Sequence, residues 1–255
     1  MAKKKIIIGN WKMAPKEARE ARRVFGAIKK TAGGLRGVQT VVCPPYIYIS
    51  ELIRQVSGHR CVMGAQDCFW SEEQAHTGEI SASMLANMGV RYVIVGHSER
   101  RALGETNEEV AKKVAAVLKA GLTAVLCVGE SERDEHGNYT AFIKTQIQES
   151  LSSMRKSSLE NIIIAYEPIW AIGKSAQRAA SVEDAIEVSI LIKKVLSDMF
   201  HTEGAMNVPI LYGGSVNPHN AEGFLGGGGI DGLLVGRASL DAPAFSEILI
   251  IASQA

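Results

Sequence analysis

The segment Thr123-Ala-Val-Leu-Cys-Val-Gly129 decides the fold class. Every position between its ends is apolar, and it contains the β-branched residues that favour strands. A strand with one face in water would alternate between apolar and polar residues. A continuous apolar run is instead typical of a parallel strand, which is covered on both faces. We therefore expect this segment to lie within a parallel sheet.

Seven further β-rich runs precede and follow this segment, and stretches with helical periodicity separate most of them. Eight strands that alternate with helices predict a closed (β/α)8 barrel rather than an open sheet. No linker, low-complexity tract or block of charge divides the chain, so we predict an α/β fold with a single barrel domain over residues 1–255. The other expected strands are Lys5–Asn10, Val38–Cys43, Arg60–Ala65, Tyr92–Gly96, Asn161–Glu167, Pro209–Gly213 and Asp231–Gly236.

Helix boundaries carry their own signals. Thr106-Asn-Glu-Glu109 fits a capping box, and Gly121 marks the end of the helix that it starts. Ser181 opens a long helix that runs to about Phe200. Two further starts combine a capping residue with proline, and one helix is expected between Lys16 and Thr31, bracketed by Pro15, Gly33 and Gly34.

Composition excludes several classes of protein. The 255 residues carry a formal net charge of +1, which gives no reason to expect nucleic acid or a membrane surface as partner. Only three apolar residues follow Lys3–Lys5, too few for a secretory signal or a membrane span. The four cysteines show no metal-site spacing, so we expect no metal. Three of them, Cys43, Cys61 and Cys127, lie in apolar strand-like segments, where we expect buried free thiols. These features predict a soluble, cytoplasmic protein.

Two glycine-rich stretches imitate cofactor motifs. Gly227–Gly232 matches the dinucleotide-binding pattern, but it precedes a strand, whereas that motif follows a strand and opens a helix. Gly173-Lys-Ser175 resembles the end of a phosphate-binding loop whose first glycine would have to stand where the chain has Pro168. We predict no cofactor.

Polar residues gather where the expected strands end. Each alone has a structural interpretation as a solvated loop residue, a packed histidine or a turn glycine. All of them share one rim of the barrel, however, so their side chains converge on one pocket. The segments are Gly9-Asn-Trp-Lys12, Gly96-His-Ser-Glu-Arg100, Ala165-Tyr-Glu-Pro-Ile-Trp170, Tyr212-Gly-Gly-Ser215 and Val235-Gly-Arg237.

This set of groups suits one kind of chemistry. The carboxylate of Glu167 is placed to take a proton from carbon, and His97 and Lys12 are placed to stabilise the oxyanion that develops. Glycines at the ends of the last two strands (Gly213, Gly214 and Gly236) allow backbone N–H groups to approach a phosphate. The pattern predicts proton abstraction next to a carbonyl in a phosphorylated substrate.

Over nearly its whole length the chain resembles the triosephosphate isomerase family. The most specific motifs are Val95-Gly-His-Ser-Glu-Arg-Arg101 and Ala165-Tyr-Glu-Pro-Ile-Trp-Ala-Ile-Gly173. Further matches are Gly9-Asn-Trp-Lys12, Gly64-Ala-Gln66, Thr77-Gly-Glu-Ile-Ser81, Cys127-Val-Gly-Glu130, Tyr212-Gly-Gly-Ser-Val216 and Val235-Gly236. The resemblance implies a TIM barrel that interconverts dihydroxyacetone phosphate and D-glyceraldehyde 3-phosphate in glycolysis and gluconeogenesis.

The resemblance also implies roles for individual residues. Glu167 would be the base, and His97 a neutral electrophile whose pKa a helix N-terminus lowers. Lys12 and Asn10 would bind substrate oxygens, and Glu99 would support this network. Pro168 to Ala176 would form a lid over the substrate. Backbone amides of Gly173, Ser215, Gly236 and Arg237 would hold the phosphate.

A homodimer is implied as well. The segment Gln66–Glu79 resembles the family's dimer loop, with Thr77 reaching the neighbour's site near Asn10 and Glu99. Phe69 and Trp70, in an otherwise polar loop, suit burial in a partner.

Three departures from the family pattern bear on function. The lid reads Ile-Gly-Lys-Ser-Ala176, without two residues at its tip and with extra residues before Ser181. Arg101–Glu105 is one residue short, and Arg237 replaces a common glycine. Two alternatives therefore stay open: an isomerase of a four-carbon ketose phosphate, or a catalytically silent barrel that binds a partner.

Overall fold

The structure, a computed structural model, describes residues 4–73, 75–134, 136–172 and 178–255. Eight parallel strands follow one another around a closed barrel, and β1 completes it by pairing with β8. The predicted α/β barrel is confirmed. The strands are β1 Lys5–Asn10, β2 Val38–Cys43, β3 Cys61–Ala65, β4 Tyr92–Val95, β5 Thr123–Val128, β6 Ile162–Tyr166, β7 Ile210–Tyr212 and β8 Gly232–Val235.

The predicted strand limits agree closely with these bounds. β1 and β2 match at both ends, and the other six are shorter by one residue at one or both ends. Gly96 shows why: its φ of 67° lies outside the extended region, so the chain leaves the ladder after Val95. The residues that follow the strands are therefore free to turn over the barrel rim.

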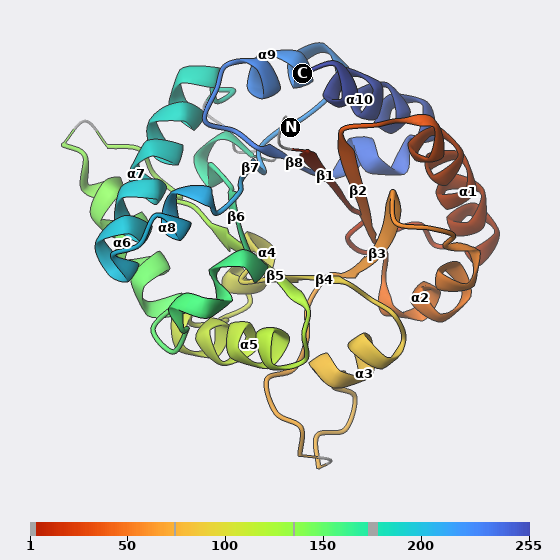
Figure 1. Ribbon diagram of the computed structural model, residues 1–255, viewed down its shortest axis with the longest axis horizontal. Helices are drawn as coiled ribbons and strands as arrows, with labels where there is room; N and C mark the ends of the chain where they lie inside the picture. Colours follow the sequence, from red (N-terminus) through yellow and green to blue (C-terminus); the bar gives the residue numbers. More distant parts are fainter. Residues whose placement is uncertain (1–3, 74, 135, 173–177) are drawn as a thin grey trace.

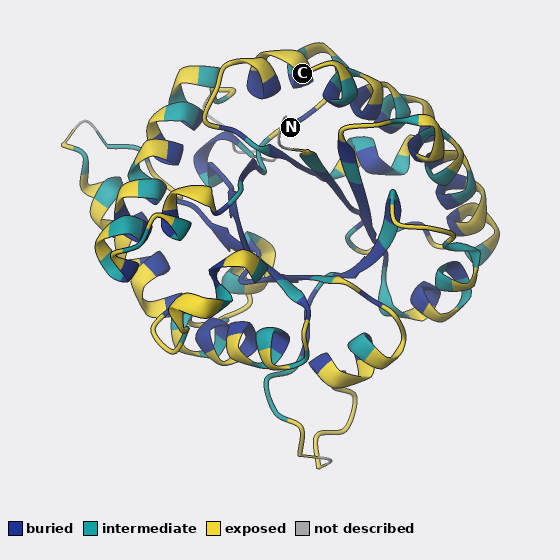
Figure 2. Cartoon of the chain, viewed as in Figure 1, coloured by how far each residue is buried: buried dark blue, intermediate teal, exposed yellow. Residues whose placement is uncertain are grey.

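Helices form an outer ring around the barrel (Figure 1). Their inward faces are buried and their outward faces exposed, whereas the strands are mostly buried throughout (Figure 2). The α-helices are α1 Ala18–Gly34, α2 Tyr46–Leu52, α3 Ala82–Asn87, α4 Ser98–Ala102, α5 Asn107–Lys119, α6 Asn138–Ser150, α7 Val182–Phe200, α8 Gly204–Asn207, α9 Pro218–Gly226 and α10 Ala242–Gln254. Short 3-10 helices are η1 Ile53–Gln55, η2 Lys156–Asn161, η3 Ile169–Ala171 and η4 Arg237–Leu240.

The helix signals of the sequence are largely confirmed. Thr106 forms a capping box with Glu109 at the start of α5, and Ser181 forms one with Asp184 at the start of α7. Asn217 and Asp241 cap α9 and α10, each followed by a proline in the first turn. The prediction for α1 was wrong at its end, because Gly33 and Gly34 lie within the helix and not beyond it.

Two apolar layers hold the barrel together. One fills its interior, and the other lies between the strands and the helices. Burial of this apolar surface is the main stabilising contribution to the fold. All four cysteines are buried and free, which confirms the prediction for Cys43, Cys61 and Cys127. The interior residues are Ile8, Val41, Cys43, Ile94, Val125, Cys127, Ile163, Ala165, Leu211 and Leu234.

Candidate active site

The ends of β4 and β6 bring an imidazole and a carboxylate into direct contact. Nε2 of His97 lies 2.9 Å from Oε1 of Glu167, and the backbone N–H of Ser98 donates to Oε2 of Glu167 at 2.9 Å. Glu167 is 3% exposed and His97 6% exposed. The backbone N–H of Glu167 donates to Val128 at 2.8 Å, which continues the barrel ladder one residue beyond β6. The carboxylate is therefore fixed at both its backbone and its side chain.

Electrostatics keep Glu167 ionised. Burial raises the pKa of Glu167, but contact with His97 and the Ser98 N–H outweighs burial and leaves the pKa below its usual value. For His97, burial lowers the pKa, but the carboxylate of Glu167 outweighs burial and raises it, contrary to the lowered pKa that the family resemblance implied. The two shifts have the same physical origin. The carboxylate of Glu167 favours the protonated form of His97, and His97 favours the ionised form of Glu167.

The other nitrogen of His97 indicates which form the ring takes. His97 caps the N-terminus of α4, and its Nδ1 accepts the backbone N–H of Glu99 at 3.2 Å. A nitrogen that accepts a hydrogen bond carries no proton, so the proton of the neutral ring is on Nε2, facing Glu167. The positive end of the helix dipole also opposes an imidazolium. The hydrogen bond at Nδ1 and the helix end thus favour a neutral imidazole that donates from Nε2 to the carboxylate, and they oppose that carboxylate, which raises the pKa of His97.

Lys12 follows β1 with an unusual backbone. Its φ is 53°, a region that costs a non-glycine residue about 1–3 kcal/mol and is common at functional sites. Three contacts hold it there: its N–H donates to Oδ1 of Asn10 at 3.0 Å, its carbonyl accepts from Nε2 of Gln66 at 2.8 Å, and its Nζ lies 2.6 Å from Oε1 of Glu99. Asn10, Lys12 and Glu99 are thus brought together, as the sequence predicted.

Gln66 belongs to this network as well as to the segment expected to form a dimer loop. Its Nε2 also donates to the carbonyl of Cys43 at 2.9 Å, so one amide group ties the ends of β1 and β2 together. Ser98 and Gln66 are the residues whose roles sequence reasoning missed. For Ser98 the active group is a backbone N–H, which leaves no signature in residue type.

Gly213, the first glycine after β7, acts differently from the expectation. Gly213 does not offer its N–H to a ligand, because that N–H donates to the carbonyl of Tyr166 at 2.7 Å. Its lack of a side chain matters instead, since a Cβ there would lie 3.1 Å from Cγ of Glu167. At Gly214 a Cβ would collide with the Tyr212 hydroxyl at 2.2 Å. Both glycines make room for neighbouring side chains.

Among the predicted phosphate ligands, Ser215, Gly236 and Arg237 lie after β7 and β8, and Gly173 lies outside the described residues. Within the described part of the chain, the N–H groups of Ser215 and Arg237 enter no backbone–backbone hydrogen bond. Gly236 faces Lys12, whose Cε would lie 3.6 Å from a Cβ at position 236. Arg237 is exposed and begins η4.

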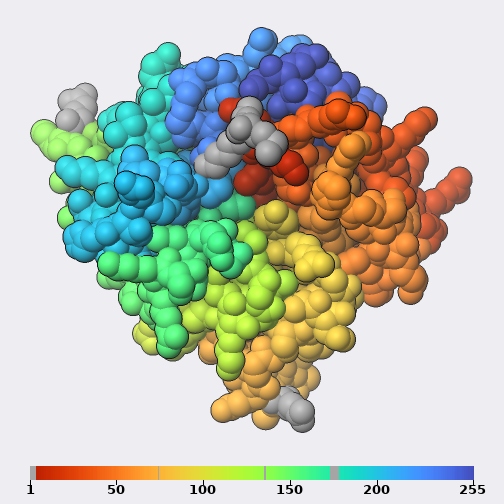
Figure 3. All heavy atoms as spheres, viewed as in Figure 1, coloured from red at the N-terminus to blue at the C-terminus, as the bar shows by residue number. Residues whose placement is uncertain are grey.

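The segment between β3 and α3 projects beyond the ring of helices (Figure 1) and forms the orange projection in the space-filling view (Figure 3). Phe69 and Trp70 stack with their ring centroids 4.2 Å apart, and His76 packs on Phe69 at 4.5 Å. Both aromatic residues are half-buried, while Thr77 is exposed.

A cluster of charges, buried except at the exposed Arg100, connects this projection to the element that carries Ser98. Asp67 accepts from Nζ of Lys113 at 2.6 Å and lies 2.7 Å from Nε of Arg100. Glu105 contacts the same two cations. Burial raises the pKa of Asp67, and the adjacent Lys113 opposes this rise. The cluster holds α4 in place beside the active-site groups.

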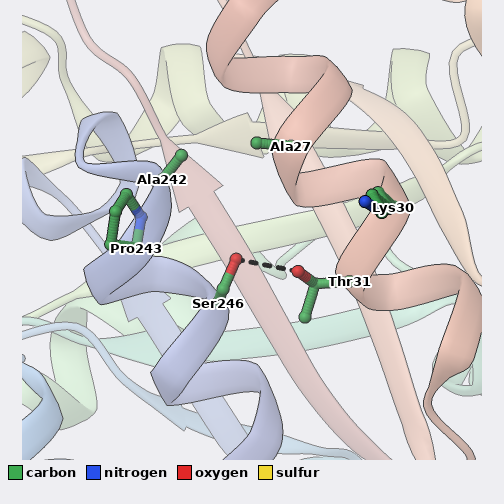
Figure 4. Close-up of a pocket in the computed structure, with 6 residues that line it drawn as sticks. All are labelled: Ala27, Lys30, Thr31, Ala242, Pro243 and Ser246. Atoms are coloured by element: carbon green, nitrogen blue, oxygen red, sulfur yellow. Dashed lines mark hydrogen bonds between the residues drawn. The ribbon is translucent and has the colours of Figure 1, made fainter.

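A groove away from these residues lies between α1 and α10, in the outer ring of helices (Figure 4). Thr31 and Ser246, which line it, share a hydrogen bond of 3.0 Å. None of its lining residues belongs to the site described above. Within the described ranges, no three His, Cys, Asp or Glu residues gather as a metal site would require.

Comparison with known proteins agrees with this geometry. The sequence model of the triosephosphate isomerase family matches residues 5–252. The triosephosphate isomerase of Geotalea uraniireducens is 42% identical over 250 residues, covering 97% of this chain and 98% of the relative. That of Rhodopirellula baltica is 43% identical over 260 residues, covering 100% of both.

A solved structure extends the agreement to three dimensions. The crystal structure of triosephosphate isomerase from Bartonella henselae superposes with a TM-score of 0.85 at 34% identity, covering 97% of this chain and 98% of that one. A match of this breadth includes all eight strands and the rim that they present. The chain belongs to the triosephosphate isomerase family.

Proposed function

We propose that this chain interconverts dihydroxyacetone phosphate and D-glyceraldehyde 3-phosphate, with Glu167 as the base. The observation that carries the proposal is the buried contact between His97 and Glu167 beside Lys12, on the strand-end rim of a barrel of this family. The lowered pKa of Glu167 keeps it ionised at neutral pH, which is the form that accepts a proton.

The geometry supports an order of events. In the structure, Oε1 of Glu167 accepts a hydrogen bond from the Nε2–H of His97. A substrate carbonyl oxygen needs the same donor. Substrate binding would therefore transfer that donor from the carboxylate to the carbonyl, and the freed carboxylate would turn to the neighbouring carbon. Glu167 then takes the carbon-bound proton, which leaves an enediolate, and returns it to the adjacent carbon. The hydroxyl proton of one substrate oxygen moves to the other in the same conversion, beside the imidazole of His97.

Charge stabilisation falls to His97 and Lys12. The neutral imidazole donates to the oxygen on which charge develops, and the Lys12 ammonium supplies a nearby positive charge. Asn10 and Glu99 hold Lys12 at its backbone and at its ammonium group. We propose that Lys12 and Asn10 also bind substrate oxygens.

The phosphate would lie beyond this end of β7 and β8. Backbone amides of Ser215, Gly236 and Arg237 are the proposed ligands, together with Gly173. The unpaired N–H groups of Ser215 and Arg237 in the described chain support this assignment, because such groups are the ones that bind anions.

We also propose that the chain acts as a homodimer through the projection Gln66–Glu79, with Phe69, Trp70 and Thr77 meeting a second copy. Large apolar side chains outside the projection support this, since Met13 is 96% and Leu103 85% exposed. Met13 directly follows Lys12, so a partner that covered it would also stiffen the active site. Sedimentation at micromolar concentration should give twice the mass of one chain, and an active monomer would contradict the proposal.

Membership of the family supports a proposal about the setting of the reaction. We propose a cytoplasmic enzyme of glycolysis and gluconeogenesis, with one domain over residues 1–255. No helix among the described residues is long and apolar enough to cross a membrane. Nothing in the comparisons favours a four-carbon substrate or a silent barrel.

The direct test is turnover of D-glyceraldehyde 3-phosphate by the purified protein, compared with Glu167→Asp and with a four-carbon ketose phosphate as substrate. Shortening the side chain withdraws the carboxylate from the substrate carbon. A misplacement on the order of 1 Å can cost about 10²-fold in rate. A kcat for Glu167→Asp within twofold of the wild type would remove Glu167 from the role of base.

A further inference from the structure

Trp170 lies three residues after Glu167, and its indole ring is contacted both at the N–H on its edge and at its face. Its Nε1–H donates to Oε1 of the buried Glu130 at 2.7 Å, and the same oxygen accepts from the hydroxyl of Tyr166 at 2.8 Å. The guanidinium carbon of Arg178 lies 4.6 Å from the centre of the indole ring. A cation at this distance over a tryptophan face is attracted by the ring.

Arg178 is itself fixed on the opposite side. Its Nη1 and Nη2 donate to the two carboxylate oxygens of Asp184 at 2.6 and 3.1 Å, and Asp184 lies in the first turn of α7. Such paired contacts set both the position and the orientation of a guanidinium. The Arg178 side chain is 55% exposed, whereas Trp170 is 6% exposed, so the guanidinium lies on the solvent side of the indole.

A second arginine approaches the same ring and the same carboxylate. The guanidinium carbon of Arg133 lies 5.8 Å from the ring centre of Trp170, and its Nη1 lies 3.3 Å from Oδ1 of Asp184. Arg133 is also paired with Glu187 and covers Tyr139. Arg178 is therefore the closer and more exposed of two cations that Asp184 directs onto one indole.

Backbone contacts link the segment that contains Trp170 and Glu167 to the residues that follow β5. The N–H of Ile169 donates to the carbonyl of Glu130 at 3.0 Å. Gly129 packs so tightly on the same segment that a Cβ there would lie 1.8 Å from the carbonyl oxygen of Glu167. Residues 167–170 thus run along residues 128–130, and the Trp170 ring anchors the far end of this short segment.

We propose that Arg178 is a positioning residue for the isomerase reaction, acting through Trp170 to fix the segment that carries Glu167. The inference rests on the proposed role of Glu167 as base. Among the residues that the structure describes, Arg178 contacts Trp170 and Asp184 and none of the proposed catalytic or phosphate-binding side chains. Its removal should therefore lower turnover, because the carboxylate loses a support, while substrate affinity changes little.

The test uses the full-length protein with Arg178→Ala, the conservative variant Arg178→Lys, and Arg36→Ala as the control at an exposed arginine. The indole N–H signal of Trp170, assigned by comparison with Trp170→Phe, reports on the ring. For Arg178→Ala we expect this signal to shift, its hydrogen exchange to accelerate and kcat to fall about threefold, with KM within twofold. Lysine should recover most of the kcat, because it retains a cation for both the ring and Asp184.

A wild-type kcat or an unmoved Trp170 signal in Arg178→Ala would overturn the inference, as would a rise in KM equal to the fall in kcat. Glu167→Asp is measured alongside. An unchanged kcat in Glu167→Asp would overturn the proposed base and this inference with it. An unchanged kcat in Arg178→Ala beside an impaired Glu167→Asp would overturn this inference alone.

Discussion

The backbone of Gly213 lies directly against the side chain of Glu167, so that a Cβ at position 213 would come within 3.1 Å of Glu167 Cγ and 3.2 Å of the Tyr166 carbonyl oxygen. A neighbour at this distance has to give way by a few tenths of an ångström. Movement of the Glu167 side chain is the shift that affects activity, because it displaces the carboxylate from its contacts with His97 and Ser98.

We expect Gly213→Ala to lower kcat roughly tenfold, a smaller loss than the one that a full 1 Å misplacement causes. The matched control is Gly26→Ala in the interior of α1, where a Cβ meets nothing within 4 Å. That change should leave kcat unaltered and stabilise the protein by about 0.5–1 kcal/mol, because alanine favours a helix. Equal kcat values in the two variants would show that Gly213 makes no room for the base.

Gln66→Leu tests whether Gln66 acts within its own chain. Leucine has a similar volume but leaves the carbonyls of Lys12 and Cys43 without the amide donor. An unsatisfied buried carbonyl costs about 1–3 kcal/mol, and the strained backbone of Lys12 would relax to avoid it. We expect kcat/KM to fall roughly tenfold while the sedimentation coefficient stays that of the wild type. A loss of activity that appears only with dissociation would instead assign Gln66 to the dimer contact.

The fold was predictable from the sequence because its signals are local. Apolar runs such as Val93–Val95 mark strands covered on both faces, and capping pairs such as Thr106 with Glu109 mark helix starts. The rim was predictable for a related reason, since every parallel strand delivers the residue after it to the same end of the barrel. Ser98 and Glu167 are in contact there although they lie 69 positions apart in the sequence, and His97 contacts the same carboxylate.

The sequence did not predict contacts made by backbone groups or by side chains that cross between elements. The N–H of Ser98 and the occupied N–H of Gly213 depend on how the chain turns after its strand, which residue type does not report. The sequence placed Gln66 in a polar loop, and only the folded chain shows that its amide donates a hydrogen bond to the carbonyl of Lys12. Gly33 and Gly34 read as helix breakers, but α1 continues through both.

The ion pair between Arg178 and Asp184 should stabilise the folded protein at neutral pH and lose this effect at low pH. The hydrogen bonds from Arg178 lower the pKa of Asp184 to about 2, below its ordinary value of 3.8. A carboxyl group whose pKa is lowered in the folded protein adds stability that is complete above about pH 4 and is lost as the pH falls toward 2. We expect Asp184→Asn to lower the urea midpoint at pH 7, and the difference from wild type to shrink between pH 4 and pH 3. A difference independent of pH would assign the effect to packing and not to charge.

Arg237 offers the last test, because it combines a proposed phosphate-binding N–H with an exposed charged side chain. Its φ is not positive, so position 237 does not require glycine, and the backbone N–H keeps its place in Arg237→Gly. The variant therefore removes the guanidinium and leaves the amide. The side chain is exposed and, among the described residues, no carboxylate lies within 4.0 Å of it, so it is available to a phosphate.

A charge-assisted hydrogen bond contributes about 1.5–3 kcal/mol when well formed and less when water competes. We expect KM for D-glyceraldehyde 3-phosphate and the inhibition constant of inorganic phosphate to rise severalfold in Arg237→Gly, with kcat nearly unchanged. The rise should be larger at low salt, because ions screen exposed charges over about 10 Å at 0.1 M. Arg237→Lys should retain the salt dependence, since it retains the charge. If both constants stay at their wild-type values at either salt concentration, the guanidinium is solvated and the amide alone binds the phosphate at this position.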